Sequence, residues 1–281
     1  MLTPEARLCA ALAPYLKQGV CLAFSGGCDS ALLLAVLAEE KKKQDFPLSA
    51  AMIAGPFQTE PEKAEARQTA EQWGVDLVFP DVPDLLSLPQ ILNNERDRCY
   101  HCKKMMFQTL CNFAEHAQIQ TVMDGTNADD LKVYRPGRQA LLELGVISPL
   151  AEAGLSKTEV RSLAAEMGLS TATKPASACL ATRFPYGTRL LPERLQSVGR
   201  AEQRLREMGF GQLRVRCHGT AARLELELDQ PGVSDLFQHR EQAIREALAA
   251  EGFDTVLLDP AGFRSGSFDT DVTTRGSQKD K

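Results

Sequence analysis

The stretch that decides the fold is Val20-Cys21-Leu22-Ala23-Phe24-Ser25-Gly26-Gly27-Cys28-Asp29-Ser30. Its five apolar residues predict a buried strand, and residues 29–38 predict a helix. The two glycines between them allow a ligand to approach the backbone closely, and the N–H groups at a helix start favour an anion. Ser25 and Ser30 can add donors, and Asp29 can hold a divalent cation. The stretch predicts a phosphate-binding loop, although it is not a Walker A loop. The alternative is a Gly-rich connecting turn.

Composition and charge limit the class of protein. The chain has 281 residues, enough for two domains of unequal size. Its net charge of −5 argues against stable binding to nucleic acid or to an anionic membrane. No apolar run approaches the roughly 20 residues that span a bilayer, and residues 1–16 lack signal-peptide features. We therefore expect a cytoplasmic protein whose eight cysteines serve packing, metal binding or catalysis before disulfides.

The order of the predicted elements indicates an α/β domain. Strands are expected at residues 20–24, 48–54, 75–79 and 119–123, with a short fifth strand at 147–150, and helices alternate with them. This alternation predicts a parallel sheet with helices on both faces. Ser156-Lys157-Thr158-Glu159 forms a capping box that starts a further helix. The stretch Asp124-Gly125-Thr126-Asn127-Ala128-Asp129-Asp130 follows the fourth strand, where its polar residues are ligand candidates or members of a capped turn.

A different pattern follows residue 190. A helix at 192–208, strands at 213–217 and 224–228, a helix at 234–250 and a strand at 255–258 predict a smaller α+β domain. We therefore divide the chain into a nucleotide domain at 1–170, a linker at 171–190 that carries Cys179, and the α+β domain at 191–263. Residues 264–281 have no apolar period and are expected to form a disordered tail.

Cys99 and Cys102 form a C-x-x-C pair at the start of a predicted helix, where the helix dipole and Lys103 favour thiolates. A redox pair would be expected in a thioredoxin-like context, which the sequence lacks. Zinc would need four ligands. A third cysteine would complete a three-thiolate iron–sulfur site with one open iron. Packing is the remaining alternative. Cys179 is either structural or, between Lys174 and Arg183, a thiolate.

Arg214 and Arg216 alternate with apolar residues, so both point to one side of their predicted strand. Glu225 on the next strand can face them. This arrangement is either a phosphate or carboxylate site, or a solvated sheet face with ordinary cross-strand ion pairs.

Several of these stretches together resemble one family. The Ser25–Ser30 loop resembles the pyrophosphatase loop of the ATP-pyrophosphatase superfamily. With the other stretches it is similar to LarE-type ATP-dependent sulfur transferases, which build the nickel-pincer nucleotide cofactor of lactate racemase. The resemblance spans roughly residues 20–265. The matching stretches beyond the loop are Arg98-Cys99-Tyr100-His101-Cys102-Lys103, Asp124-Gly125-Thr126-Asn127 with Asp129-Asp130, Arg135-Pro136-Gly137, Ser148-Pro149-Leu150, Ala178-Cys179-Leu180 with Pro185-Tyr186-Gly187, and Arg214-Val215-Arg216.

The resemblance implies an adenine-nucleotide-hydrolase-like fold and a two-step reaction. ATP with Mg²⁺ would adenylate a carboxylate of a pyridinium-3,5-dicarboxylate mononucleotide, and a sulfur nucleophile would then displace AMP to give a thiocarboxylate. It also implies a homo-oligomer. The residues expected to bind ATP are Ser25, Gly26, Gly27, Asp29, Ser30, Gly125 and Thr126. Asp29 and Asp124 are expected to hold Mg²⁺, and Arg183, Arg214, Arg216 and Glu225 to bind the nucleotide substrate.

The cysteines distinguish two mechanisms within the family. In some members the cysteine matching Cys179 stands alone and sacrifices its own sulfur. This sequence also has Cys99 and Cys102, and so resembles the variant in which three cysteines hold a [4Fe–4S] cluster that transfers an extra sulfide. The three cysteines are therefore the expected catalytic residues, while the sulfur donor stays open. Sacrificial use of Cys179, a tRNA-thiolation enzyme of the same superfamily and a non-catalytic ATP-binding module are the alternatives.

Overall fold

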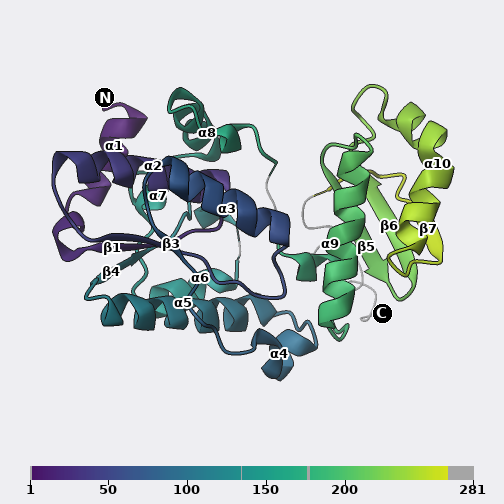
Figure 1. Ribbon diagram of the computed structural model, residues 1–281, viewed down its shortest axis with the longest axis horizontal. Helices are drawn as coiled ribbons and strands as arrows, with labels where there is room; N and C mark the ends of the chain where they lie inside the picture. Colours follow the sequence, from purple (N-terminus) through teal and green to yellow (C-terminus); the bar gives the residue numbers. More distant parts are fainter. Residues whose placement is uncertain (1, 134, 176–177, 265–281) are drawn as a thin grey trace, which may run out of the picture. The chain divides into compact units, whose positions relative to one another are not determined.

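The computed structural model describes residues 2–133, 135–175 and 178–264. The chain divides into two compact units. The first comprises residues 1–91 and 97–177, and the second comprises residues 92–96 and 178–281. Each unit has its own sheet (Figure 1).

The sheet of the first unit is parallel throughout. It consists of β1 (Val20–Ala23), β2 (Leu48–Ala51), β3 (Leu77–Val78) and β4 (Thr121–Met123), in the order β3-β2-β1-β4. The order reverses between β1 and β4, because β1 has β2 on one side and β4 on the other. In open α/β sheets this reversal point, at the carboxyl ends of the strands, is where ligands bind. The loop after β1 and the loop after β4 therefore lie in the position expected for a site.

Helices cover both faces of this sheet, as the sequence predicts. In Figure 1, α2 (Cys28–Lys43) and α3 (Glu60–Gln72) lie above the sheet and α5 (Arg98–His116) lies below it. The two faces follow from alternation along β1: Leu22 packs in the core with α2, whereas Cys21 packs in the core with α5. The α/β fold class is confirmed.

The remaining elements of the first unit are short, apart from α8. They are α1 (Pro4–Leu12), α4 (Pro89–Leu92), α6 (Gly137–Glu143), α7 (Pro149–Glu152), α8 (Lys157–Glu166) and the 3₁₀ segments Leu16–Gln18, Leu85–Ser87, Asp129–Lys132 and Ser170–Ala172. The capping box of α8 is present in full, because Ser156 accepts from the backbone of Glu159 and the Glu159 side chain accepts from Ser156.

The predicted fifth strand at residues 147–150 is wrong. Ile147 makes only an isolated parallel bridge to Met123, and the chain then enters α7 at Pro149. Proline favours this outcome, because it lacks a backbone N–H for a sheet and its fixed φ suits the first turn of a helix.

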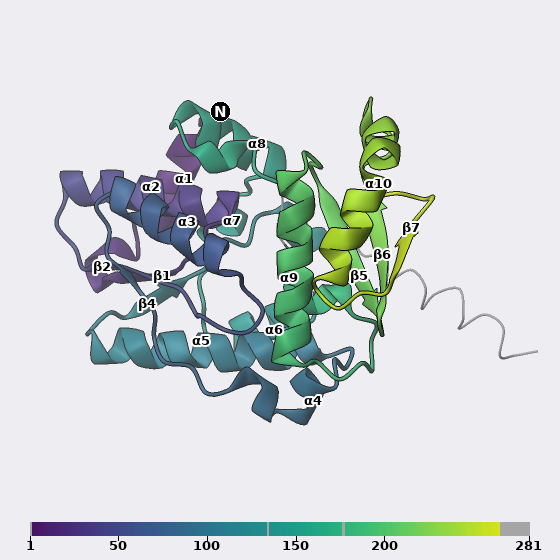
Figure 2. The same ribbon diagram turned by 45° about the vertical axis from the view of Figure 1, so that its right-hand side comes forward.

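The second unit is a mixed three-stranded sheet with two helices. Strands β5 (Leu213–His218) and β6 (Ala221–Leu226) pair antiparallel, and β6 pairs parallel with β7 (Thr255–Leu258). Helix α9 (Pro192–Glu207) contacts β5, and α10 (Val233–Ala249) contacts both β7 and α9 (Figure 2). The 3₁₀ segment Leu180–Arg183 also belongs to this unit. The predicted small α+β region is thus present; of the predicted tail, only Arg264 lies among the described residues.

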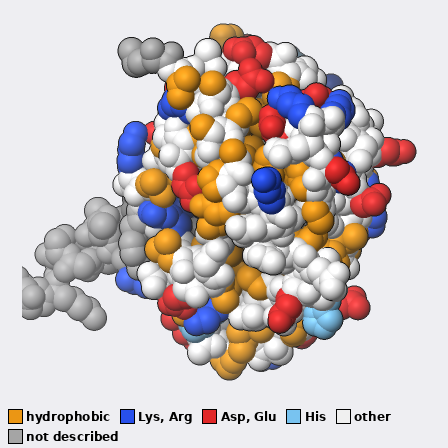
Figure 3. Space-filling model, turned by 90° about the vertical axis from the view of Figure 1, so that its left-hand side faces the viewer, with side chains coloured by type: hydrophobic (Ala, Val, Ile, Leu, Met, Phe, Trp, Pro, Cys, Tyr) orange, Lys and Arg blue, Asp and Glu red, His pale blue; other side chains and the backbone are white. Residues whose placement is uncertain are grey.

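The helices and the surface charges of the described residues can be compared with the expected absence of membrane-spanning and nucleic-acid-binding features. None of the helices in the described ranges combines the length and apolar character needed to cross a membrane. On the face shown in Figure 3, acidic, basic and apolar side chains of the described residues are interspersed, without a continuous area of one sign of charge.

Candidate active site

The loop between β1 and α2 is held in shape by its own hydroxyl groups. The Ser30 hydroxyl accepts from the backbone N–H of Ser25 (3.3 Å), donates to the carbonyl of Gly27 (3.1 Å) and lies 3.1 Å from the Ser25 hydroxyl. Gly26 has φ +69°, a conformation that favours glycine, and a Cβ there would lie 3.3 Å from the Cβ of Ala66. The backbone therefore forms a fixed turn at the start of α2, the geometry expected of an anion-binding loop.

Asp29 lies on the first turn of α2 and has a partner on each carboxylate oxygen. Asn127 donates to Oδ1 at 3.1 Å, and the ammonium group of Lys157 forms an ion pair with Oδ2. Asn127 follows β4 and Lys157 begins α8, so side chains from two other segments converge on the carboxylate of α2. Sequence reasoning includes Asn127 among the ligand candidates after β4 but gives Lys157 no role at Asp29.

The loop after β4 packs directly against the loop after β1. A Cβ on Gly125 would lie 3.1 Å from both the Cβ of Asp29 and the backbone nitrogen of Ser30. Asp124 is 4% exposed and accepts from the hydroxyls of Thr126 and Ser148, each at 2.6 Å. The structure thus brings the predicted ATP-binding residues together at the reversal point of the sheet. The hydrogen bonds of Asp124 give its carboxylate a role in shaping this turn; its role as a metal ligand stays a prediction.

Cys99 and Cys102 lie on the first turn of α5. Cys99 is exposed and Cys102 is partly buried. Arg98, only 4% exposed, donates through Nη2 to the Cys99 sulfur at 3.2 Å. Gly137, at the start of α6, packs so closely that its Cβ would lie 3.3 Å from the Cys99 carbonyl and 3.0 Å from Cγ of Lys103. The turn that carries the thiol pair is therefore held firmly and faces a positive neighbour.

Cys179 belongs to the second unit, where it precedes the 3₁₀ segment Leu180–Arg183. Its side chain is exposed, while its carbonyl accepts from the backbone (2.9 Å) and the hydroxyl (2.8 Å) of Thr182. Among the residues that the structure describes, no group of three or more His, Cys, Asp or Glu side chains is arranged to hold a metal ion. The convergence of the three thiols on one cluster stays a prediction.

A buried ion pair anchors the segment after Cys179. Arg183 binds Glu202 through two nitrogens, at 2.7 and 2.9 Å, and also donates to the carbonyl of Ala178 at 2.8 Å. Glu202 is further paired with Arg206 at 3.1 Å. Burial alone would raise the pKa of Glu202, but Arg183 and Arg206 outweigh it, and the pKa lies below its usual value. Arg183 therefore positions the backbone around Cys179; its contact with substrate stays a prediction.

Arg214 and Arg216 share one face of the second sheet with Glu225. Arg214 lies opposite Glu225 in the register, and Arg216 pairs with Glu225 at 2.8 Å. Arg216 and Glu225 are 1% and 0% exposed, so this face is not solvated, whereas the cross-strand ion pair of that alternative is present. Burial, followed by repulsion from Arg183 and Arg216, lowers the pKa of Arg214 to about 10. A crowded set of desolvated guanidinium groups is stabilised by an anion, as in a phosphate site.

Sequence reasoning missed Lys157 and Glu202, and it included Asn127 among the ligand candidates without its partner Asp29. Asn127 stands within a quoted motif, and Lys157 directly follows the N-cap of α8, but neither position reveals the partner. Glu202 was detectable, because it lies on the apolar side of α9 among Val198, Ala201 and Leu205. A carboxylate there needs a buried cation.

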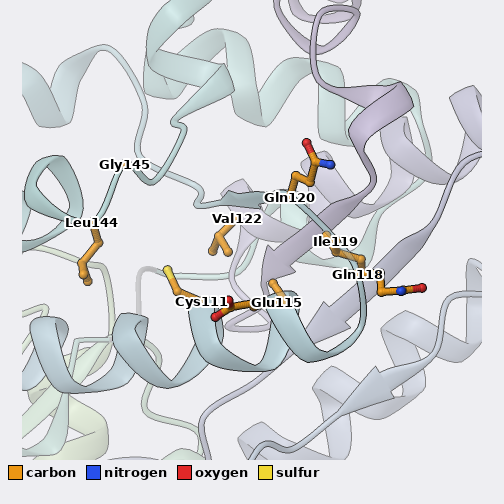
Figure 4. A pocket seen from close by; sticks show the side chains of 9 residues that line it. Cys111, Glu115, Gln118, Ile119, Gln120, Val122, Leu144 and Gly145 are labelled. Carbon is orange, nitrogen blue, oxygen red and sulfur yellow. The ribbon is translucent and has the colours of Figure 1, made fainter.

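A pocket of about 500 Å³ lies at the end of the first sheet where β4 begins, which is the end opposite to the phosphate loop (Figure 4). It is lined by residues at the end of α5 and the start of β4, including Cys111 and Gln120, whereas the phosphate loop follows the other end of the strands. Burial raises the pKa of the Cys111 thiol, so this cysteine is a poor nucleophile.

Comparison with known proteins identifies the family. The chain is 37% identical over 271 residues to the pyridinium-3,5-bisthiocarboxylic acid mononucleotide synthase of Lactiplantibacillus plantarum, covering 96% of this chain and 95% of that protein. It is also 37% identical to an uncharacterized protein of Synechocystis (90% and 92% covered) and 30% identical to one of Methanocaldococcus jannaschii (89% and 93% covered). No protein-family model matches. The coverage of nearly the whole chain shows that this protein belongs to the family of LarE-type sulfur transferases.

Proposed function

We propose that this protein is an ATP-dependent sulfur transferase that converts a carboxylate of a pyridinium-3,5-dicarboxylate mononucleotide into a thiocarboxylate, for nickel-pincer cofactor synthesis. The observation that carries the proposal is the 37% identity, over 96% of the chain, to a relative named as the corresponding bisthiocarboxylate synthase. The fixed Ser25–Ser30 loop supports the use of a nucleoside triphosphate.

The first step is adenylation. The substrate carboxylate attacks the α-phosphorus of ATP, a new O–P bond forms, and the bond to the bridging oxygen breaks so that pyrophosphate leaves with its electron pair. The N–H groups at the start of α2 would bind the phosphates, and Asp29 would hold Mg²⁺. AMP is a far better leaving group than a carboxylate oxygen. Adenylation therefore prepares the acyl carbon for attack by the sulfur nucleophile.

We assign binding of the acceptor to the face of the second sheet that carries Arg214, Arg216 and Glu225, called the arginine face below. The desolvated Arg214 guanidinium, beside Arg216 and Arg183, is suited to the phosphate of a mononucleotide, because arginine binds phosphate through two parallel hydrogen bonds. Glu225 fixes Arg216 at 2.8 Å and so orients this face before the substrate arrives.

The sulfur chemistry is assigned to Cys99, Cys102 and Cys179. The exposure of Cys99 and Cys179 and the Arg98 guanidinium at 3.2 Å from the Cys99 sulfur suit thiolate ligands. Three thiolates are the donor set of a [4Fe–4S] cluster with one open iron. When bound, such a cluster would supply that iron as a place to carry sulfur. The chain's own contribution is to hold two thiols on one helix turn and the third beside the Arg183 anchor.

The test is anaerobic reconstitution followed by three measurements on one sample: iron and sulfide content, pyrophosphate release, and mass spectrometry of the acceptor. The proposal expects pyrophosphate release that depends on the pyridinium dicarboxylate mononucleotide, with a gain of sulfur in that acceptor. ATP binding without pyrophosphate release would favour a non-catalytic module, and release that depends on tRNA would favour a tRNA-thiolation enzyme. Conversion of Cys179 to dehydroalanine during turnover would favour the sacrificial route.

A further inference from the structure

We propose that Lys157 is an internal counter-ion, which occupies the cation position at Asp29 until a triphosphate arrives, so that a divalent metal enters this position only together with the nucleotide. The inference rests on the proposed use of ATP at the Ser25–Ser30 loop and goes beyond it, because it assigns a residue and an order of binding.

The backbone of Lys157 is fixed, whereas its side chain is able to move. Its N–H donates to Asp129 Oδ2 at 2.8 Å, and the Ser156–Glu159 capping box holds the same turn. Arg7 pairs with Glu159 and ties this helix start to α1. The Lys157 side chain is 33% exposed, and its four methylene groups allow the ammonium group to reorient without a change in the backbone.

Both oxygens of Asp29 are engaged in the present arrangement. Lys157 pairs with Oδ2, and Asn127 donates to Oδ1 at 3.1 Å. A divalent cation bound to this carboxylate would stand within a few ångströms of the ammonium group, and two cations at such a distance repel strongly in a partly desolvated site. Metal and ammonium therefore compete for Asp29.

A triphosphate resolves this competition, because it supplies additional anionic oxygens beside the loop. The metal can then bridge Asp29 and phosphate oxygens, while the Lys157 ammonium moves to a phosphate oxygen and keeps an anionic partner. The carboxylate is never left without a cation. Lys157 thus becomes a phosphate contact when ATP is bound, and the site excludes free metal when it is not.

The experiment uses Mn²⁺ as the probe and follows its binding by electron paramagnetic resonance in the full-length protein. Without nucleotide, Lys157→Ala and Lys157→Gln should bind Mn²⁺ at least tenfold more tightly than the parent, and adding Asp29→Asn should abolish that gain. With ATP, the same variants should bind the nucleotide about tenfold more weakly, the loss of one charge-assisted phosphate contact. Lys157→Arg should resemble the parent in Mn²⁺ exclusion.

The matched control is Lys132→Ala, which removes an exposed ammonium group paired with Asp129 in the neighbouring segment and should leave both isotherms unchanged. Equal Mn²⁺ affinity of the parent and both Lys157 variants without nucleotide would overturn the inference, as would tight Mn²⁺ binding at Asp29 in the nucleotide-free parent. The readouts need neither acceptor nor sulfur. Absence of sulfur transfer with intact Mn²⁺–ATP coupling would therefore refute the proposed function and leave this inference standing.

Discussion

Gly125 approaches Asp29 so closely that a Cβ on Gly125 would lie 3.1 Å from the Cβ of Asp29. The second contact of that Cβ, also at 3.1 Å, would be the backbone nitrogen of Ser30. Because neither group is the far end of a flexible side chain, the only relief is a shift of the turn. This approach joins the ends of β1 and β4, and makes glycine a requirement of the site.

Gly125→Ala should therefore weaken ATP binding by about tenfold or more while the protein still folds, since a turn displaced by a few tenths of an ångström loses aligned hydrogen bonds to phosphate. Isothermal titration with ATP measures the effect. Gly211→Ala is the control, because its Cβ would meet only the carboxylate end of Glu227. Unchanged ATP affinity in Gly125→Ala would show that the loop after β4 is not part of the nucleotide site.

Asp29→Asn should fold normally and lose pyrophosphate release, because the amide cannot supply the charge that holds the metal. The hydrogen bond from Asn127 and the packing of the turn are compatible with an amide of the same shape. Asp45→Asn, at an almost fully exposed position at the end of α2, is the control. Full pyrophosphate release with an ordinary Mg²⁺ dependence in Asp29→Asn would show that this carboxylate has no role in the reaction.

The sequence predicts the loop and most of the architecture because the signals are local. The apolar run before Ser25, the two glycines and the Ser156–Glu159 capping box are each read within a few residues, and the structure has all of them. The prediction failed at residues 147–150, where a short apolar stretch resembles a strand and Pro149 directs the chain into a helix instead.

Contacts between distant segments could not be predicted. Lys157 and Asp29 are 128 positions apart, and no periodicity in the sequence predicts which carboxylate a lysine at the start of a helix will contact. The burial of Arg216 likewise depends on segments outside its own strand, because Thr182 and Glu225 both contact it. Partners of charged residues are a property of the tertiary fold, and sequence patterns supply only the candidates.

Glu202→Gln should destabilise the protein by about 3–5 kcal/mol at pH 7, since it leaves a buried arginine without its counter-charge. Because the folded-state pKa of Glu202 is lowered, the stability that its charge provides is present above its ordinary pKa of 4.5 and is lost as the pH falls through the folded-state value. The free energies of unfolding of parent and variant, measured with urea, should therefore become equal at low pH. Glu241→Gln, which breaks an exposed pair with Arg245, should have little effect. A difference in the free energy of unfolding that stays constant down to acid pH would contradict the role of charged Glu202 as the counter-ion of Arg183.

Arg214→Ala should weaken binding of the acceptor mononucleotide by about tenfold or more and leave ATP affinity intact, because a guanidinium–phosphate contact contributes about 1.5–3 kcal/mol. Separate titrations with the two nucleotides measure the effect. Arg240→Ala, at an exposed position of α10, controls for the loss of a positive charge alone. Identical acceptor titrations for parent and Arg214→Ala would exclude this face as the acceptor site.

Single alanine substitutions of Cys99, Cys102 and Cys179 should each abolish the absorption of the cluster and sulfur transfer, yet preserve ATP binding. The proposal is that a cluster draws the three thiols together, because three thiolates at one site without a cation would repel one another. In the proposed cluster each of the three sulfurs is a ligand, so the losses should be equal. Cys111→Ala is the control, since this thiol lines the pocket at the other end of the sheet.

The three variants also separate the two sulfur mechanisms. A shared cluster requires Cys99 and Cys102 as strictly as Cys179, whereas a sacrificial sulfur requires Cys179 alone. Transfer that survives both Cys99→Ala and Cys102→Ala in anaerobic protein, and is lost only in Cys179→Ala, would overturn the cluster. In that case one turnover should leave Cys179 lighter by the mass of H₂S, which intact-protein mass spectrometry detects directly.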